Sequence, residues 1–384
     1  MRKEDSQVTI RSWATERLSD DIRRSLDRLA RSDDVRHIAV MPDVHLSRDV
    51  CIGTAFATSH LVYPDAIGGD IGCGISAVAF DAFRFDVSQD RAHQLSRAMR
   101  GVVPIQRQRT GAARMLAARV PASADLSVPT LRRFADTEGA SQIGTLGTGN
   151  HFLELQYDDE EQLWLMVHSG SRGLGQAIRA AHIEFADRSR SGLKFLDVNT
   201  SVGDAYLQDM HWARRFAAES RRAMLLAIGA AANNLFGWQL LEDTLFDCDH
   251  NHINYEEHFG EAQFVHRKGA MAAWPDVPGI VPGSMAAPSF HVTGRGLAAA
   301  LCSSAHGAGR AMSRTEARQR VNRTRLLQEL RDVYVDPRIV GGLREEAPSA
   351  YKNIRAVMKA QRMLVRVRRT LLPILTYKGM AKRQ

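Results

Sequence analysis

Short runs of apolar residues, bounded by glycine, proline or charged residues, recur along most of the chain. This pattern is typical of β-strands buried in a sheet. One example is the run HIAVM, which ends at Pro42-Asp43, and another pair of runs is separated by the glycine-rich loop DAIGGDIGCG. The strands predicted in this way cover residues 37–41, 52–62, 75–80, 151–156, 163–167, 264–266, 271–273 and 289–292.

Apolar residues at helical spacing mark a second group of segments. Ile22, Leu26 and Leu29 recur every three to four residues, which predicts an amphipathic helix at the start of the chain. The longest helical pattern contains the run MHWARRFAAESRRAMLLAIGAAANNL. The predicted helices cover residues 20–31, 88–100, 205–235, 321–330 and 351–371.

The order of these elements predicts the fold class. Strand and helix signals alternate irregularly, whereas a doubly wound parallel sheet would require regular alternation. The sequence also contains no internal repeat and no segment with the composition of a linker. We therefore expect a single α+β domain over residues 1–384.

Composition limits the class of protein. The chain has 384 residues, of which 44% are hydrophobic and 24% charged, and these are ordinary values for a globular protein. No apolar run approaches the roughly 20 residues that span a bilayer, and the first residues lack the apolar core of a signal peptide. We therefore expect a cytoplasmic protein without a membrane partner. Its four widely spaced cysteines, Cys51, Cys73, Cys248 and Cys302, form no small disulfide framework.

The charge is uneven along the chain. The formal net charge is +8, and residues 359–384 contain eight Lys and Arg residues but no Asp or Glu. A basic excess favours polyanionic partners, with nucleic acid first among them. Charge alone supports a solvated basic tail equally well.

A group of metal-binding side chain types is the first candidate for chemistry. Asp70 and Cys73 lie three residues apart in the glycine-rich loop, and a carboxylate with a thiolate suits a transition metal better than Mg²⁺ or Ca²⁺. His151, His168 and His250 lie at predicted strand ends or turns and are candidates for the remaining ligands. Taken singly, each of these histidines is better explained as a residue at the edge of the core, while a small buried residue in a tight turn explains Cys73 equally well.

The remaining histidines have less support. His252 and His258 lie close to His250 and are competing ligand candidates. The others are interpreted as structural or solvated residues: His37, His60, His93, His182, His211, His266 and His291.

The stretch CSSAHGAGRAMSR suggests phosphate binding. Small residues at 307–309 leave backbone N–H groups open to an anion, and His306 precedes them. Arg310 and Arg314 add planar cationic groups that suit phosphate oxygens. Taken alone, a glycine turn with a surface histidine explains the stretch better, because short glycine motifs are common. Weaker signals of the same kind are Arg172, the turn at residues 282–285, Ser289 and Lys378.

Together, these pieces resemble one known family. The chain contains, in order, MPDVH, DIGCG, LGTGNHFLE, VHSGSRGLG, DHN, HFGE, RKGA, PGSM, SAHGAGRAMSRTEA, EAPSAYK and a terminal KG. This series resembles the RtcB-type RNA ligases over residues 38–379. The resemblance implies one large domain with mixed sheets around a central metal and nucleotide cleft. It also implies an enzyme that uses GTP and Mn²⁺ to join RNA 3′-phosphate or 2′,3′-cyclic phosphate ends to 5′-hydroxyl ends, in RNA repair or tRNA splicing.

The resemblance implies a role for each matching residue. His306 would attack the α-phosphate of GTP and become guanylylated, and Asp43 would orient its imidazole. Cys73 would bridge two Mn²⁺ ions, with His151 and His168 completing one metal site and Asp70 and His250 the other. The RNA-end phosphates would be held by Arg172, Arg310 and Arg314. GMP or GTP contacts would fall on Asn150, His151, Phe152, Leu153, Glu154, His250, Asn251, Pro282, Gly283, Ser284, Met285, Ser289, His306, Gly307, Ala308, Gly309 and Lys378.

Four positions depart from the pattern that the resemblance leads us to expect. Ser47 and Asp49 stand where glycines are usual, Gly69 where valine is usual, and Asn353 where Asp is usual. Because the nucleophile and the metal ligands are present, we expect the guanylylation chemistry to be retained. The departures concern the preferred RNA end, and a specialised repair paralogue fits them.

Two alternatives remain at this stage. One is a Mn²⁺-dependent enzyme that caps RNA or DNA 3′-phosphates with guanylate without efficient sealing. The other is a non-catalytic protein that binds nucleic acid through its basic tail, which would leave the candidate metal ligands without a role. The expected partners are RNA with the ends described above and an archease-type activator, and we expect a monomer.

Overall fold

The computed structural model describes residues 8–379. The basic tail predicted from the sequence therefore lies only partly within it, because residues 380–384 fall outside the described range. None of the described helices combines the length and apolar character that a membrane crossing requires.

Helices and strands alternate irregularly along the described chain, as the sequence predicts. The helices are α1 (Asp20–Ala30), α2 (Pro64–Ile67), α3 (Gln89–Val102), α4 (Thr110–Leu116), α5 (Pro129–Gln142), α6 (Arg172–Ile183), α7 (Ser201–Phe236), α8 (Arg314–Arg320), α9 (Arg323–Glu329) and α10 (Ile354–Ala360). The strands are β1 (Thr9–Ser12), β2 (His37–His45), β3 (Ile52–Thr58), β4 (Leu61–Val62), β5 (Gly74–Phe83), β6 (Phe152–Tyr157), β7 (Gln162–Ser169), β8 (Asp187–Arg188), β9 (Lys194–Asp197), β10 (Leu240–Asp249), β11 (Asn251–His258), β12 (Glu261–Lys268), β13 (Ala270–Ala272), β14 (Pro278–Val281), β15 (Ser289–Gly294), β16 (Ser303–Ala305) and β17 (Val365–Lys378).

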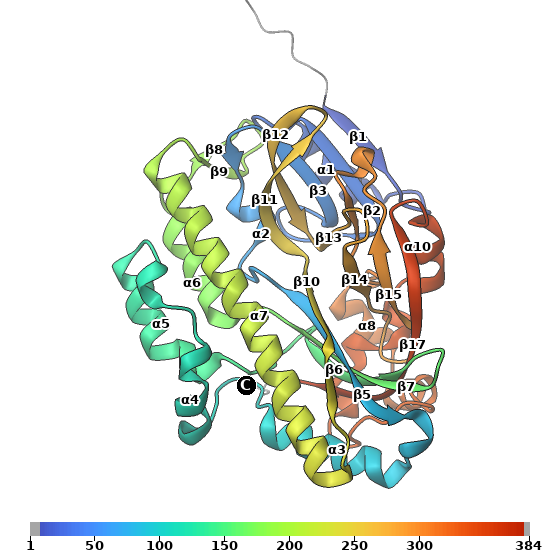
Figure 1. The fold of residues 1–384 in the computed structure, drawn as a ribbon. Helices are drawn as coiled ribbons and strands as arrows, with labels where there is room; N and C mark the ends of the chain where they lie inside the picture. Colours follow the sequence, from blue (N-terminus) through green and yellow to red (C-terminus); the bar gives the residue numbers. More distant parts are fainter. Residues whose placement is uncertain (1–7, 380–384) are drawn as a thin grey trace, which may run out of the picture.

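The larger sheet has seven strands in the order β10-β5-β7-β6-β17-β15-β14, with every neighbouring pair antiparallel. The inner strand β7 is buried on both faces, because one face is covered by helices and the other packs against further core residues. Helices α3 and α7 cover the first face, where Leu153, Leu165 and Leu225 belong to one hydrophobic cluster. Figure 1 shows α7 running diagonally across this sheet, with α4, α5 and α6 beyond it.

A second sheet has five strands in the order β1-β2-β3-β12-β11, and the short pair β13-β16 packs next to it. Strand β10 of the first sheet leads directly into β11 of the second, with His250 as the connecting residue. The loop before β5, the loop before β6 and the end of β16 meet near this junction. The two sheets therefore bring together segments that are far apart in the sequence.

The α+β prediction is confirmed, and the long helix is found as α7, which begins after Thr200 and ends at Gly237. The prediction of one strand over residues 52–62 is wrong, because the chain turns between β3 and β4. The buried carboxylate of Asp34 accepts hydrogen bonds from the backbone N–H groups of Ser59, His60 and Leu61, which fixes that turn.

The prediction of helix over residues 351–371 is wrong beyond Ala360. Helix α10 ends there, and β17 begins at Val365 and continues to Lys378. The segment VRVRRT alternates β-branched and charged residues, a pattern that favours a strand over a helix.

Helices α5 and α6 were not among the predicted elements. Helix α6 begins inside the glycine-rich run HSGSRGLG, which has the composition of a turn. Its glycines have a packing role: a Cβ on Gly175 would lie 2.7 Å from the backbone oxygen of Gly69 and closer still to Ser171 Oγ. A helix that must approach the 68–73 loop so closely needs glycine there.

Candidate active site

His306 and Asp43, the predicted nucleophile and its orienting acid, lie side by side. His306 Nδ1 is 2.7 Å from Asp43 Oδ2, the carboxylate is fully buried, and 15% of the His306 side chain is exposed. An imidazole that donates its Nδ1–H to a carboxylate keeps the lone pair on Nε2. The arrangement therefore leaves Nε2 available as a nucleophile.

The backbone around this pair explains the glycine-rich turn. His306 directly follows β16, whose Ala305 pairs with Ala270 of β13, and Asp43 lies near the end of β2. Gly309 adopts a φ of 71°, and a Cβ at this position would lie 2.2 Å from the backbone oxygen of Asp43. The small residues after His306 thus allow the turn to pack directly on the strand that carries Asp43.

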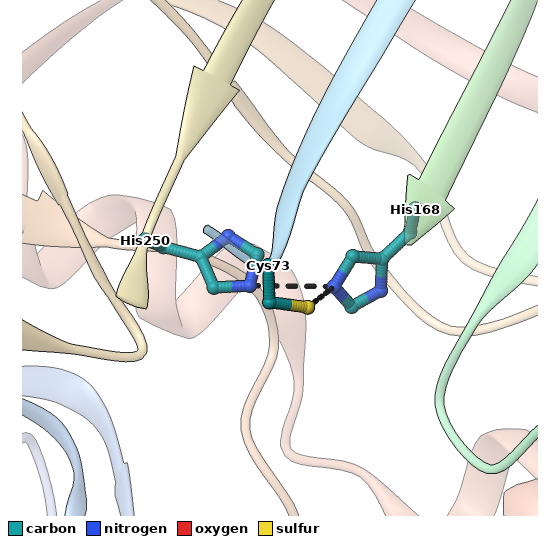
Figure 2. Close-up of side chains that lie close together, drawn as sticks. All are labelled: Cys73, His168 and His250. Atoms are coloured by element: carbon teal, nitrogen blue, oxygen red, sulfur yellow. Dashed lines mark hydrogen bonds between the residues drawn. The ribbon is translucent and has the colours of Figure 1, made fainter. Parts of the chain in front are cut away.

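Cys73 lies at the centre of the candidate metal site, between the rings of His168 and His250 (Figure 2). Its Sγ is 3.2 Å from His168 Nε2, and His168 Nε2 is 3.3 Å from His250 Nε2. All three side chains are buried, and their donor atoms lie within 4.8 Å of one another. The ring of His250 also lies 4.5 Å from that of His306, measured between centroids.

Asp70 and His151 complete the cluster on the other side of Cys73. His151 Nε2 lies 3.0 Å from Asp70 Oδ2 and 3.6 Å from Cys73 Sγ. The structure thus brings all five predicted ligands together, but their spacing divides them differently from the expected division. It groups His168 with His250 and His151 with Asp70, and Cys73 is common to both groups.

The outer ring nitrogens of two histidines are held by the backbone. His151 Nδ1 lies 3.0 Å from the carbonyl oxygen of Leu146, and His168 Nδ1 lies 3.2 Å from that of Asn150. A carbonyl can only accept, so each Nδ1 carries the proton and each Nε2 turns its lone pair towards the cluster. Metal-binding histidines typically donate their other ring N–H to a carbonyl or carboxylate in this way.

The electrostatics of the cluster favour neutral imidazoles. Burial lowers the pKa of His168 and His250 well below the ordinary histidine value, and the neighbouring imidazoles lower it further. Burial, together with the Asp70 carboxylate, raises the pKa of the Cys73 thiol well above its usual range. A neutral imidazole is the ligand form, while a buried thiol needs a nearby cation to become a thiolate. The donor set therefore fits a divalent transition metal.

A cavity of about 860 Å³ opens beside His306. It is large enough for a nucleotide and part of a second group. Many of the predicted nucleotide and phosphate contacts line it, namely Asn150, Phe152, Glu154, Pro282, Gly283, Ser284, Met285, His306, Gly307, Ala308, Gly309, Arg310, Arg314 and Lys378.

Five predicted nucleotide contacts do not line this cavity, and two of them, His151 and His250, belong to the metal cluster. Leu153 is fully buried in the core beneath α3 and α7, so its side chain lies away from the cleft. The side chain of Asn251 is engaged by the backbone: its NH₂ group donates to the carbonyl oxygen of Asp70, and its oxygen accepts from the N–H of Gly269. Ser289 is buried behind the turn at residues 282–285, where its hydroxyl accepts from the N–H of Gly283.

Glu346 is a site residue that sequence reasoning missed. Its carboxylate is 2% exposed and lies 3.1 Å from Lys378 Nζ, 3.2 Å from Arg310 Nη1 and 3.6 Å from Arg314 Nε. Tyr351 donates its hydroxyl to the same carboxylate at 2.5 Å. Burial alone would raise the pKa of Glu346, but the surrounding cations and Tyr351 hold it below its usual value. Glu346 is the first residue of the motif EAPSAYK, and this motif is the signal in the sequence that could have identified it as a site residue.

The three predicted phosphate-binding arginines differ in their free donors. Arg310 is almost fully engaged by the protein, because Nε donates to Met312, Nη1 to Glu346 and Tyr351, and Nη2 to the carbonyl of Glu345. Arg310 nevertheless lines the cavity, and its role as an RNA contact stays a prediction.

Arg314 is half exposed at the cavity, and within residues 8–379 it forms a single ion pair, a long one with Glu346. It is therefore the arginine that retains donors for a phosphate. Arg172 does not line the cavity; its Nη1 lies 3.4 Å from His151 Nδ1, behind the metal cluster. The structure thus places Arg172 beside the metal cluster, and its contact with an RNA-end phosphate stays a prediction.

One wall of the cavity combines a loop that carries no signal in the sequence with one residue from each of the motifs MPDVH and EAPSAYK. The exposed loop of residues 14–19 lines it, together with His45 and Lys352. Lys352 Nζ donates to the carbonyl of Val44 at 2.6 Å and so fixes the chain next to Asp43. An exposed polar loop has no motif, so its position could be learned only from the fold.

The competing histidines are excluded from the cluster. His252 lies 2.9 Å from Asp249, and His258 lies 2.9 Å from Glu256, both in a buried charge network beneath β16. His182 likewise bonds Asp209 in the core. These residues are structural, as predicted for His182.

Comparisons with known proteins agree with the geometry. Residues 26–379 match the family model described as tRNA-splicing ligase RtcB. The chain is 37% identical over 373 residues to the RNA-splicing ligase RtcB of Escherichia coli K12, covering 90% of each chain. It is 30% identical over 422 residues to the RNA-splicing ligase RtcB of Mycobacterium bovis (90% of this chain, 97% of that protein) and 27% identical over 421 residues to the tRNA-splicing ligase RtcB of Methanococcus maripaludis (89% and 88%). The matched range includes the metal cluster, Asp43 and His306.

Proposed function

The chain belongs to the RtcB family, and from this premise we propose that it is a GTP- and Mn²⁺-dependent RNA ligase. It would join an RNA 3′-phosphate or 2′,3′-cyclic phosphate end to a 5′-hydroxyl end. One observation carries the proposal: His306 Nδ1 contacts the buried Asp43 at 2.7 Å, beside the cluster of metal donors and at the cavity.

His306 performs the first step. Its Nε2 attacks the α-phosphorus of GTP, a P–N bond forms, and the bond to the bridging oxygen breaks so that pyrophosphate leaves. The Nδ1 proton remains on the ring, where Asp43 stabilises the positive charge that develops on the imidazole. The product is a histidine–GMP intermediate.

Two further transfers complete the reaction. An oxygen of the RNA 3′-phosphate attacks the phosphorus of the histidine–GMP, and His306 leaves with its electron pair restored. The 5′-hydroxyl oxygen then attacks the activated 3′-phosphate, loses its proton to solvent, and expels GMP. A 2′,3′-cyclic end must first be opened by water to give the 3′-phosphate.

The five donors Asp70, Cys73, His151, His168 and His250 would hold two Mn²⁺ ions, with Cys73 shared. The ions would neutralise charge on the phosphates that meet His306. The fit rests on two groups of three donor atoms that share Cys73, each group lying within 4.8 Å, and on backbone contacts that fix the tautomers of His151 and His168. A set of imidazole, thiolate and carboxylate is typical of transition metals.

Other residues of the cavity would bind the guanylate and the RNA end. Glu154 is buried and offers carboxylate oxygens that match the N1–H and N2–H₂ donors of guanine. The ammonium of Lys378 lies 5.4 Å from the ring centroid of Phe152, next to the same region. Arg314 would bind an RNA-end phosphate, because its guanidinium retains free donors at the cavity.

A second candidate function uses the same chemistry but stops earlier. An enzyme that caps RNA or DNA 3′-phosphates with guanylate would need His306 and the metals, but no productive site for the 5′-hydroxyl strand. The observation in its favour is the pair Ser47 and Asp49, whose side chains line a smaller groove next to Leu46 of the cavity wall.

Covalent labelling tests the proposal. Incubation with α-³²P-labelled GTP and Mn²⁺ should label the protein, and His306→Ala should remain unlabelled with an unchanged melting temperature. Absence of label on the wild-type protein would refute the nucleotidyl-transfer chemistry altogether. Adding RNA with a 3′-phosphate and a separate 5′-hydroxyl RNA should then give a joined product, whereas accumulation of guanylate-capped RNA alone would favour the second candidate.

A further inference from the structure

The positive charge of the chain is concentrated at its C-terminal end. Ten of the 51 Lys and Arg residues lie in the last 38 residues, together with none of the 43 Asp and Glu residues. The first 346 residues therefore carry 41 basic against 43 acidic side chains. The proposed active site uses Lys378 of this segment, which leaves most of the charge without a role.

Six cationic side chains of the described chain form what we call the basic patch. Two come from α10, one from the turn after it, two from the start of β17, and one from the turn after β15. All six are exposed, and they are Arg295, Arg355, Lys359, Arg362, Arg366 and Arg368.

The fold holds these segments together. The backbone N–H of Arg295 donates to the carbonyl of Leu364 at 2.9 Å, which places the β15 turn against the start of β17. Strand β17 pairs with β15 so that Arg366 lies opposite Thr293. Arg355 and Lys359 are four residues apart on α10 and therefore share one helix face. Figure 1 shows α10 lying at the side of the molecule next to β15 and β17.

A β-bulge exposes one of the arginines. The register between β15 and β17 shifts where His291 pairs with Arg369 and Val292 with Val367, so Arg368 is the extra residue. A bulge changes the direction in which the side chain of the extra residue points. Arg369, by contrast, lies 3.3 Å from Asp158 and is held over the Trp164 ring, so it is not part of the patch.

The patch carries charge that the protein does not neutralise. Within residues 8–379, none of its six members takes part in an ion pair, whereas nearby cations such as Arg318 and Arg369 do. Six unpaired cations on one surface repel one another, and a bound polyanion relieves that repulsion.

We propose that the basic patch binds the sugar–phosphate backbone of the substrate RNA at a distance from the end that reacts. Arg368 and Lys378 lie ten residues apart on the same strand, which corresponds to about 33 Å at about 3.3 Å per residue. A helical strand covers that length with about ten nucleotides at roughly 3.4 Å each. The patch therefore selects RNA that continues well beyond the break. This inference rests on the proposed ligase function, because it assumes that an RNA end occupies the cavity.

An anionic membrane surface fits the patch less well. Membrane-surface helices present a free apolar face beside their basic face. The apolar residues of α10, Ile354, Val357 and Met358, are instead buried in the core. The exposed apolar side chains between the arginines are only Met363 and Val367 within the patch segment.

Charge reversal tests the proposal. In the patch variant, Arg362, Arg366 and Arg368 are each changed to Glu. A control variant of the same net charge changes Arg97, Arg133 and Arg222 to Glu, which are exposed residues of α3, α5 and α7. The probes are an RNA hairpin of about 20 base pairs and an RNA of about four nucleotides, both with a 3′-phosphate, because only the longer one reaches about 33 Å from its end.

The affinity of the patch variant for the hairpin should be lower by a factor of about ten or more. The slope of log K against log salt should become less steep by about two to three, because each lost phosphate contact removes about 0.9 from the slope. The variant's binding of the short RNA and its labelling by GTP should stay unchanged, as should the hairpin affinity of the control variant. Changing the three patch arginines to Lys should restore most of the affinity.

Equal weakening in the patch and control variants, or unchanged hairpin binding in the patch variant, would overturn the proposal. So would a patch variant that loses binding only to vesicles of phosphatidylserine. These outcomes are separate from failure of the ligase proposal, which would appear as absent GTP labelling in the wild-type protein.

Discussion

At the scale of single residues, the tautomer of His306 is set by one contact. Asp43 is buried, and its Oδ2 lies 2.7 Å from His306 Nδ1. Replacing the carboxylate by an amide keeps the shape but removes the charge, and its NH₂ group can donate to Nδ1. Such a contact would favour the tautomer that carries the proton on Nε2, which cannot attack phosphorus.

Asp43→Asn should therefore lower the initial rate of covalent guanylylation by at least about 100-fold, the usual size of a lost orienting or acid–base contribution. The rate is measured with α-labelled GTP in single-turnover conditions. Metal content, measured in parallel, should remain that of the wild-type protein. A rate within about threefold of wild type would show that Asp43 does not orient the nucleophile.

Glu154 provides a pH-dependent prediction. Burial raises the pKa of its carboxyl group to about 7, although Thr376 and Gln156 donate hydrogen bonds to it. Guanine donors bind the ionised form better, so GTP affinity should rise as pH increases from 6 to 8. The native state binds the extra proton between the ordinary carboxyl pKa and about 7, so Glu154 makes the unliganded protein less stable as pH rises through this range.

Calorimetric titration with GTP at several pH values measures this effect. Glu154→Gln should weaken GTP binding at pH 8 and flatten its pH dependence. If the variant keeps the same pH profile as the wild-type protein, another group is responsible.

Residue types could be predicted well where the chemistry demands them. A nucleophilic histidine, a buried acid and a set of Cys, His and Asp ligands are recognisable in sequence, and the structure brings all of them together. The contacts that Arg310 makes with the protein could not be predicted, because they depend on Glu346 and Tyr351, which lie 36 and 41 residues further along the chain. Sequence shows which donors exist, but only the fold shows which of them are already used.

At the scale of elements, β16 determines where the nucleophile lies, because His306 directly follows it. The two residues before it, Leu301 and Cys302, both have left-handed backbone conformations, with φ of 51° and 42°. Residues other than glycine adopt this conformation only at an energetic cost. The buried Arg267 bonds the carbonyl of Leu301 at 2.9 Å and the hydroxyl of Ser303 at 2.9 Å, and so holds the turn in place.

Arg267→Met should therefore destabilise the protein and slow guanylylation. It removes these bonds and leaves Glu256, which Arg267 contacts at 2.6 and 2.9 Å, buried without its main cationic partner. Breaking such a pair typically lowers the free energy of unfolding by about 3–5 kcal/mol. Urea unfolding followed by tryptophan fluorescence measures the change. A loss below about 1 kcal/mol would show that the turn is held by other contacts.

The elements themselves were predictable to different degrees. Helix α7 has strong periodicity, a polar cap at Thr200 and a glycine at its end, so local signals suffice. The local pattern predicts helix over the first part of β17, because its exposed arginines have good helix propensity. Its strand conformation is fixed instead by pairing with β6 and β15. Pairing partners far apart in sequence are information that a local pattern does not contain.

At the scale of the whole molecule, the metal cluster connects parts of both sheets. Cys73 precedes β5 and His168 ends β7 in the seven-stranded sheet, while His250 joins that sheet to β11 of the five-stranded sheet. A metal bound here would link the two sheets in the folded state only. Ligands that bind the native state alone stabilise it by mass action.

Adding Mn²⁺ to the chelator-treated protein should raise its melting temperature. The gain is about 2.7 kcal/mol when the free ion is at 100 times its Kd, which amounts to a few degrees for a chain of this size. Cys73→Ser should lose most of the shift, because the shared donor is weakened for both groups of ligands. Cys248→Ser is the matched control: Cys248 lies on β10 outside the cluster, so this variant should respond like the wild-type protein. If Cys73→Ser and Cys248→Ser responded equally to Mn²⁺, the ion would bind elsewhere, and the five converging side chains would need another explanation.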